Sequence, residues 1–371
     1  MTMGGKVIAA GHICLDITPV FPADRRAERP EELLVPGKLL NVEPADVHTG
    51  GSVANTGLAL KILGNDVRLL GKVGNDAFGS MVREIAAGCG ADGLIVDESS
   101  STSYSVVLAM PGIDRIFLHC PGANDSFSNA DIPDSALTDA VLFHFGYPPI
   151  MKRMYENDGA ELTAIFKRVK GHGIATSLDL AAVDPCSDAG RADWRNILAN
   201  VIPYVDFFVP SFEELCFMLD RERYDRLAAK GGDMTEGLDL EAEAAPLADM
   251  LSEMGSRAVL IKCGLSGMYY RTAGIERMAA VGERLGLDAA LWADKCGIQP
   301  CFKAEKVLSA TGAGDASIAA YLTAVLHGKA PEDCAALAAA EGACAVTSYD
   351  ALGGLKSLEE LEKTVREQKC L

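Results

Sequence analysis

The chain carries at residues 309–317 the stretch Ser309-Ala310-Thr311-Gly312-Ala313-Gly314-Asp315-Ala316-Ser317. An apolar helical pattern follows this stretch and ends at His327-Gly328, where the glycine suits a left-handed helix cap. The glycine turn therefore lies at the amino end of a helix, where the amides of Ala313, Gly314 and Asp315 form a ready anion site. A carboxylate there makes chemical sense if it takes a proton from an attacking hydroxyl while the amides hold a transferring phosphoryl group. A tight turn with Asp315 as a helix cap is the alternative.

Short apolar runs alternate with helical patterns on the amino-terminal side of this stretch. We expect strands at residues 7–10, 67–72, 140–145, 175–180, 205–209 and 258–262. Helices are expected at residues 53–63, 78–88, 160–169, 213–219, 244–254 and 316–326. Several of the strands are apolar on both faces, as buried parallel strands are. The alternation predicts an α/β fold in which helices cover both faces of a parallel sheet.

Four segments depart from this alternation. Residues 20–47 are rich in proline and charge, and residues 101–119 contain two alternating strands, 104–109 and 115–119, joined by a Pro-Gly turn. We expect these two segments to form a small β flap. Residues 221–243 and 272–297 have the composition of surface insertions.

A second glycine cluster, Gly50-Gly51-Ser52-Val53-Ala54-Asn55-Thr56-Gly57, opens the helix expected at 53–63. Paired glycines let a ligand lie against the backbone, and the Asn55 amide both donates and accepts, which suits a hydroxyl-rich ligand. A helix start that needs glycine for close packing is the alternative. Asp16 follows the first strand at the edge where open α/β sheets bind ligands, although a single aspartate there is also a common turn former.

Together these features resemble the ribokinase-like (PfkB) carbohydrate kinase family. Residues 50–57 match its amino-terminal signature together with Gly71-Lys72-Val73-Gly74-Asn75-Asp76-Ala77-Phe78-Gly79, and residues 311–317 match its carboxyl-terminal signature. The resemblance covers nearly the whole chain. It implies a ribokinase-like three-layer αβα sandwich with a mostly parallel central sheet and a small β lid, as a single α/β kinase domain over residues 1–371 with lid segments at about 17–47 and 101–120.

The resemblance also implies an activity: ATP-dependent phosphorylation of a hydroxyl, we expect a primary one, of a small sugar with Mg²⁺. Asp315 would be the base, and the turn of Gly312, Ala313 and Gly314 would be the anion hole. Positions that contact substrate hydroxyls are matched by Asp16, Gly50, Gly51 and Asn55. Arg115 and His119 share one face of a lid strand, so Arg115 is a candidate contact with a sugar or a substrate phosphate; a solvated lid face is the alternative.

The nucleotide and metal positions carried over from the family include two departures. The nucleotide positions are Ser211, Glu214, Lys262, Gly264 and Gly267, with Glu214 ordering Mg²⁺ indirectly. A monovalent cation such as K⁺ would bind near Ser309, Thr311, Ala345, Ser348 and Asp350. Ser211 replaces the family's asparagine, and Ser309-Ala310 stands where many relatives have Asp-Thr, which removes an acidic side chain near that ion.

Composition limits the partners and the location. Acidic residues number 52 against 34 basic ones, a formal charge of −18, so nucleic acid and membrane surfaces are not expected partners. Eleven cysteines without a CxxC pair, and no cationic apolar leader, predict a cytoplasmic protein with reduced thiols. Length alone suggests roughly two domains or more, but motifs near both ends must meet in one site. A homodimer formed through the lid is an open expectation.

Other functions are less well supported. No Gly-Lys pair is followed by Ser or Thr, so a Walker A loop is absent, and neither HExxH nor GxSxG occurs. His144 fits a hydrogen-bonded structural histidine better than a substrate contact. A nucleoside kinase of the same family and a non-catalytic sugar sensor remain alternatives; the Asp315 turn speaks against the sensor, because a binder needs no base beside an anion hole.

Overall fold

The computed structural model describes residues 5–113, 115–348 and 350–368. Within them, the main sheet has eight strands in the order β14-β13-β12-β11-β10-β9-β1-β4. These are β1 (Lys6–Gly11), β4 (Val67–Leu70), β9 (Ala140–Gly146), β10 (Ala175–Leu178), β11 (Phe207–Phe208), β12 (Ala258–Lys262), β13 (Met268–Thr272) and β14 (Cys296–Gln299). Strands β12 through β4 run parallel, and β13 and β14 add an antiparallel edge. The mostly parallel sheet is therefore confirmed.

Helices bury both faces of this sheet. Alternate residues of β1 face opposite layers: Val7 and Ala9 belong to one apolar core, and Ile8 and Ala10 to the other. The first core includes α1 (Ser52–Ile62), α2 (Ala77–Gly88), α14 (Ala313–Leu326), α15 (Pro331–Ala345) and α16 (Leu358–Gln368). The second includes α3 (Asp134–Leu137), α4 (Lys152–Tyr155), α5 (Ala160–Gly171), α7 (Trp194–Val201), α8 (Phe212–Leu219) and α11 (Ala245–Glu253). The three-layer αβα architecture expected from the alternation is confirmed.

Helix α14, which follows the glycine turn, is buried almost all round. Its residues from Asp315 to Val325 are all buried, and it packs against α1 on one side and α15 on the other. A helix that is apolar on every face is stable only when neighbouring elements cover all of its faces. This packing fixes the amino end of α14, and with it the turn that carries Asp315.

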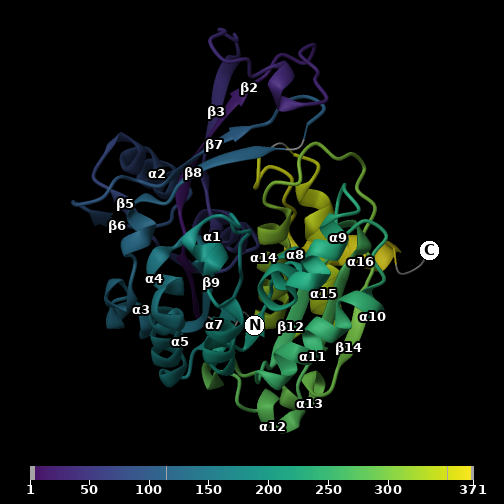
Figure 1. Cartoon of the computed structure of the whole chain (residues 1–371). Helices are drawn as coiled ribbons and strands as arrows, with labels where there is room; N and C mark the ends of the chain where they lie inside the picture. The colour runs from purple at the N-terminus through teal and green to yellow at the C-terminus, as the bar shows by residue number, and fades with distance from the viewer. Residues whose placement is uncertain (1–4, 114, 349, 369–371) are drawn as a thin grey trace.

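A second sheet rises from one end of the main body (Figure 1). It has the order β3-β2-β7-β8, from β2 (Cys14–Val20), β3 (Glu43–Gly50), β7 (Tyr104–Leu108) and β8 (Ile116–Cys120). Asp16 pairs in register with Ser105, and Ser105 with His119, so these three side chains share one face of the sheet. A separate two-stranded sheet joins β5 (Lys72–Gly74) to β6 (Ile95–Asp97).

Two local predictions were wrong. Residues 272–297 are not a surface insertion: α12 (Ile275–Met278) and α13 (Ala289–Trp292) lead to edge strand β14, and Trp292 is fully buried against Phe207 at 5.6 Å between ring centroids. The strand expected at 67–72 divides at Gly71, where the chain leaves the main sheet for β5. Residues 221–243 do lie at the surface, since most of them are exposed; they form α9 (Arg221–Ala228) and α10 (Leu240–Glu243), which are anchored by the buried Leu227 and Leu240.

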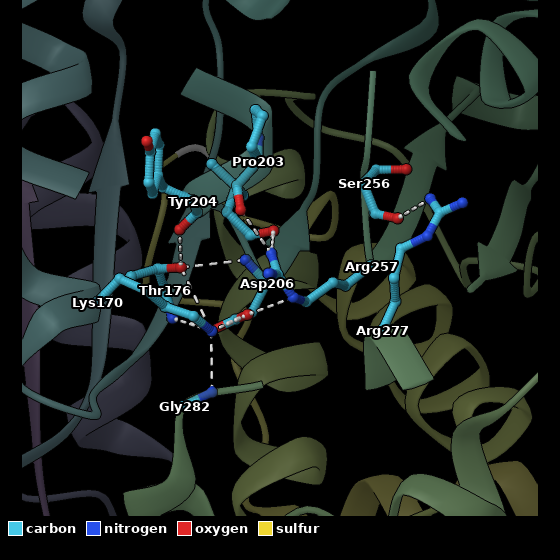
Figure 2. A network of polar contacts seen from close by, with 10 residues as sticks. Lys170, Thr176, Pro203, Tyr204, Asp206, Ser256, Arg257, Arg277 and Gly282 are labelled. Carbon is cyan, nitrogen blue, oxygen red and sulfur yellow. Dashed lines mark hydrogen bonds and ion pairs between the residues drawn. The ribbon is translucent and has the colours of Figure 1, made fainter. Parts of the chain in front are cut away.

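A buried polar network ties together the amino ends of the central strands (Figure 2). Asp206 precedes β11, is fully buried and accepts hydrogen bonds from the amides of Thr176 at 3.0 Å and Gly282 at 3.2 Å. Lys170 forms an ion pair with the same carboxylate, and Arg257 Nε lies 3.5 Å from it. Because the strands are parallel, this network lies at the opposite edge of the sheet from their carboxyl ends.

Candidate active site

The carboxyl ends of the parallel strands open into a cleft of about 820 Å³ beneath the second sheet. Its walls come from segments far apart in the chain. Of the residues proposed from the sequence, it is lined by Asp16, Gly51, Asn55, Arg115, Ser211, Glu214, Lys262, Thr311, Gly312, Gly314 and Asp315. The two glycine clusters therefore lie in one site. This was expected, because motifs near both ends of the chain had to meet.

Asp315 is held by three hydrogen-bond donors at the base of this cleft. It is only 4% exposed, and its Oδ1 accepts a hydrogen bond from Thr56 Oγ1 at 2.7 Å. Its Oδ2 accepts one from Asn55 Nδ2 at 3.2 Å and one from the Tyr147 hydroxyl at 2.7 Å. Three donors from two different segments therefore fix the orientation of this carboxyl group at the base of the cleft.

The turn beside Asp315 requires glycine at its first position. Gly312 is the N-cap of α14 with φ 74°, and a Cβ there would lie 2.4 Å from the Cβ of Ala351. The Ala313 amide donates to Ala310 O at 3.3 Å. The amides of Gly314 and Asp315 belong to the first turn, where the helix itself offers no acceptor, and the helix dipole favours an anion.

Lys262, at the end of β12, reaches the cleft beside this turn. Its Nζ lies 2.7 Å from Asp179 Oδ1 and also donates to Val209 O, and its stem passes close to Gly314. Burial raises the pKa of Asp179, the Lys262 ammonium opposes that rise, and the charges of Glu214 and Asp315 add to it. Asp179 therefore feels one ammonium and two further carboxylates across the floor of the cleft.

Ser211 and Glu214 form a reciprocal cap at the start of α8. The Ser211 hydroxyl accepts from the Glu214 amide at 3.4 Å, and Glu214 Oε2 accepts from the Ser211 amide at 2.8 Å. The serine at the position of the family's asparagine thus caps α8. Carboxylate oxygens are the ligands that Mg²⁺ prefers, so Glu214 and Asp179 fit a site for this ion.

The opposite wall of the cleft comes from the second sheet and the first glycine pair. Cys14 Sγ donates to Asp16 Oδ1 at 3.3 Å, and burial raises the pKa of Asp16. Gly51 has φ 83°, and a Cβ there would lie 2.6 Å from Nδ1 of His12. Gly50 lies outside the lining of the cleft, but a Cβ there would overlap the Asp16 carboxylate. Both glycines therefore make room for side chains that line the cleft.

Arg115 bridges the cleft. It precedes β8, and its guanidinium donates to Thr311 Oγ1, next to the glycine turn. The same guanidinium lies 5.7 Å from the ring centroid of Phe117. The solvated lid face is thus not what this structure has, because the arginine joins the second sheet to the loop before α14.

Eight of the proposed residues lie outside the lining of the cleft: Gly50, Ala313, Gly264, Gly267, Ser309, Ala345, Ser348 and Asp350. A Cβ on Gly264 would meet Thr235, and one on Gly267 would meet Gln299 O. The Asp350 carboxylate accepts from Ser348 Oγ at 3.1 Å and from the amides of Leu352 and Gly353. Ala345 O accepts from the Ser348 amide, and Ser309 Oγ donates to Thr311 Oγ1. The polar groups proposed for K⁺ thus form hydrogen bonds within their own loops. The K⁺ site itself stays a prediction.

Sequence reasoning missed Thr56, Tyr147 and Asp179. Thr56 follows Asn55 on the same helix, so the signal that indicated Asn55 applies to it as well. Asp179 was included in the strand expected at residues 175–180, whereas β10 ends at Leu178 and Asp179 follows it directly. His144 is the structural histidine that the sequence favoured: it contacts Ser52 Oγ at 3.2 Å and Ser177 Oγ at 3.0 Å, and burial lowers its pKa to about 3.

The fold and the cleft are those of an α/β kinase for small molecules. Residues 14–357 match the model of the pfkB family carbohydrate kinases, and the chain belongs to this family. It is 25% identical over 337 residues to the ribokinase of Schizosaccharomyces pombe, which covers 88% of this chain and 90% of that protein. It is 27% identical over 183 residues to fructokinase-2 of Oryza sativa, covering 47% of this chain and 52% of that one.

Solved structures share the fold. The Arabidopsis thaliana ribokinase complexed with ribose and ATP superposes with a TM-score of 0.71 at 19% identity, covering 98% of this chain and 99% of that one. The Xylella fastidiosa fructokinase with bound ATP has the same TM-score at 21% identity and covers 100% of each chain. In the described part of the chain, none of the helices is both long enough and apolar enough to cross a membrane.

Proposed function

We propose that this carbohydrate kinase uses ATP and Mg²⁺ to phosphorylate a hydroxyl, a primary one, of a small sugar. The observation that carries the proposal is the position of Asp315, a buried carboxylate next to the amino-terminal amides of α14. Asp315 takes the proton of the sugar hydroxyl as the alkoxide oxygen bonds to the γ-phosphorus and the bond to ADP breaks. The amides of Gly314 and Asp315 stabilise charge on the phosphoryl group.

In this proposal Glu214 and Asp179 supply carboxylate oxygens for Mg²⁺, and Ser211 and Lys262 line the nucleotide side of the cleft. Gly264 and Gly267 lie outside the lining and stay predicted nucleotide positions. The ion, when bound, neutralises charge on the ATP phosphates. Lys262 is already paired with Asp179, so its charge reaches ATP only if that pair is shared or reorganised. We also propose that K⁺ activates the enzyme by binding near Ser309 and Asp350, which lie in the loops before α14 and after α15.

A sugar fits the opposite wall better than a nucleobase does. Asp16, Ser105 and His119 form a polar row on the face of the second sheet toward the cleft, and Asn55 and Gly51 lie nearby. Such groups hydrogen-bond hydroxyls, whereas a base would call for an apolar slot. Nucleoside phosphorylation stays the second candidate, since a Methanocaldococcus jannaschii nucleoside kinase shares the fold with a TM-score of 0.66.

The second sheet acts as a lid in this proposal. The contact from Arg115 to Thr311 supports closure over the glycine turn, which excludes water from ATP.

Leu39, 91% exposed, and Leu118, 55% exposed, lie on lid segments and support a homodimer through them. Size-exclusion chromatography with light scattering, repeated on Leu118→Asp, tests the dimer; a monomeric parent protein would rule it out. The ten cysteines within the described residues are free thiols, in keeping with a cytoplasmic location.

Asp315→Asn tests the base. Asparagine has nearly the same size but takes no proton, and we expect kcat to fall by about 10²- to 10⁴-fold. A coupled ADP-release assay first ranks ketoses, aldoses, sugar acids and nucleosides with the unaltered protein, and the variant is then measured on the best acceptor. Near-normal turnover by Asp315→Asn would show that the assignment is wrong. Sugar-induced thermal stabilisation with no ADP from any acceptor would instead favour the sensor.

A further inference from the structure

Tyr147 adopts a backbone conformation that is rare for a residue with a side chain. It directly follows β9 with φ 66° and ψ 40°, and Pro148 comes next. Left-handed backbone at a non-glycine residue is strained, and such strain gathers at functional sites where the surroundings impose it. Here the surroundings are Gly11 and Gly146, which pair across β1 and β9, and the His12 amide, which donates to Gly146 O at 3.2 Å.

The strained turn aims the Tyr147 side chain at Asp315. Its hydroxyl donates to Asp315 Oδ2 at 2.7 Å, and its ring lies 6.1 Å from the His12 ring between centroids. Burial raises the pKa of Tyr147 well above its ordinary value, and the Asp315 charge raises it further. The hydroxyl therefore keeps its proton at working pH and serves Asp315 as a donor.

The donors are divided unequally between the two oxygens of Asp315. Each carboxylate oxygen has two lone pairs. Among the residues that the structure describes, Oδ2 receives both Tyr147 and Asn55, whereas Oδ1 receives only Thr56. One acceptor position therefore remains, and it lies on Oδ1.

We propose that Tyr147 is a positioning residue that occupies Oδ2 of Asp315, so that Oδ1 receives the proton of the attacking hydroxyl. This inference rests on Asp315 being the base of the proposed function. In the step, the O–H bond of the sugar breaks and an O–H bond forms at Oδ1, while the sugar oxygen bonds to the γ-phosphorus and ADP departs. The Asn55 amide oxygen remains available to a substrate hydroxyl.

Tyr147→Phe removes the hydroxyl and keeps the ring. Loss of a donor to the ionised carboxylate makes it easier to protonate, so the acid limb of the kcat/KM pH profile should move to higher pH by about one unit. The other acidic, basic and histidine side chains that line the cleft are unchanged in the variant, namely His12, Asp16, Arg115, His119, Asp125, Asp179, Asp184, Glu214 and Lys262. We expect kcat at neutral pH to fall about tenfold with the KM values within about twofold.

Tyr321→Phe is the matched control. Tyr321 lies on the same helix as Asp315, is buried, and packs at 6.2 Å from Phe207, outside the cleft. It should lose stability without moving the acid limb. An unmoved limb in a folded Tyr147→Phe protein overturns the inference, as does an equal shift in Tyr321→Phe.

A second replacement covers the case in which Tyr147→Phe does not fold. 3-Fluorotyrosine placed at position 147 alone keeps the shape and is a stronger donor, so the acid limb should move to lower pH; no movement overturns the inference. Asp315→Asn in the same assay distinguishes failure of the proposed function from failure of the role assigned to Tyr147. Retained activity in Asp315→Asn overturns the proposed function, whereas an inactive Asp315→Asn with an unmoved Tyr147→Phe profile overturns only the role of Tyr147.

Discussion

Gly312→Ala should disturb the glycine turn, and Gly328→Ala at the other end of α14 serves as the matched control. Gly312 and Gly328 flank α14 with φ 74° and 67°, so alanine at either one loses about 1 to 2 kcal/mol to left-handed backbone. They differ in space: a Cβ on Gly312 would lie 2.4 Å from the Ala351 Cβ, whereas Gly328 has nothing within 4 Å. Crowding adds about 1 to 3 kcal/mol at Gly312, which predicts a total loss of about 2 to 5 kcal/mol there.

The two variants should also differ in turnover. Relief of the crowding at Ala351 moves the turn, and with it the amides of Gly314 and Asp315, so we expect kcat of Gly312→Ala to fall by about 10²-fold or more. Gly328→Ala should keep its kcat. Urea unfolding gives the stability difference, and coupled ADP release gives the turnover. If the two variants lose equal stability and both keep their kcat, the geometric argument about the turn is wrong.

Two further predictions concern stability away from the glycine turn. Asp206→Asn leaves Lys170 and Arg257 without their buried counter-charge and should cost about 3 to 5 kcal/mol in urea unfolding with kcat unchanged, because the network lies at the far edge of the sheet; a loss below about 1 kcal/mol would contradict this. His144 has its pKa lowered from 6.5 to about 3 by burial and by Lys262, so its contribution is fully present above pH 6.5 and is lost as pH falls toward 3, because the unfolded chain binds the proton first. At pH 5 this loss is about 2 kcal/mol, and His144→Gln should flatten the pH dependence of unfolding between pH 6.5 and 5; an unchanged slope would show that His144 does not contribute.

The sequence was most informative where a local pattern and a global constraint agree. The turn at Gly312 can be recognised from glycine spacing alone, and the parallel sheet from apolar runs of strand length. Asp16 and Asp315 line one cleft, as expected if the motifs near both ends of the chain meet in a single site. The strand pattern alone did not place them, because Asp16 lies within β2 of the second sheet and Asp315 lies in the first turn of α14, after the antiparallel strand β14.

Contacts between distant segments could not be predicted in the same way. Tyr147 takes left-handed backbone where the preceding Gly146 pairs closely with Gly11 of β1, and the local sequence does not reveal that Gly11 lies beside it. Trp292 is buried although charged residues surround it in sequence, because a short helix turns it toward Phe207. Tertiary packing outweighed local composition in both cases.

The acidic balance of the chain extends into the cleft itself, which bears on how ATP is held. Asp16, Asp179, Glu214 and Asp315 line it together with two cations, Arg115 and Lys262. The Arg115 guanidinium already donates to Thr311, and Lys262 Nζ already lies 2.7 Å from Asp179 Oδ1. A nucleotide triphosphate entering alone would meet repulsion that the amides of one helix end offset only in part. Binding of ATP should therefore depend steeply on Mg²⁺, because the ion turns those same carboxylates from a source of repulsion into ligands.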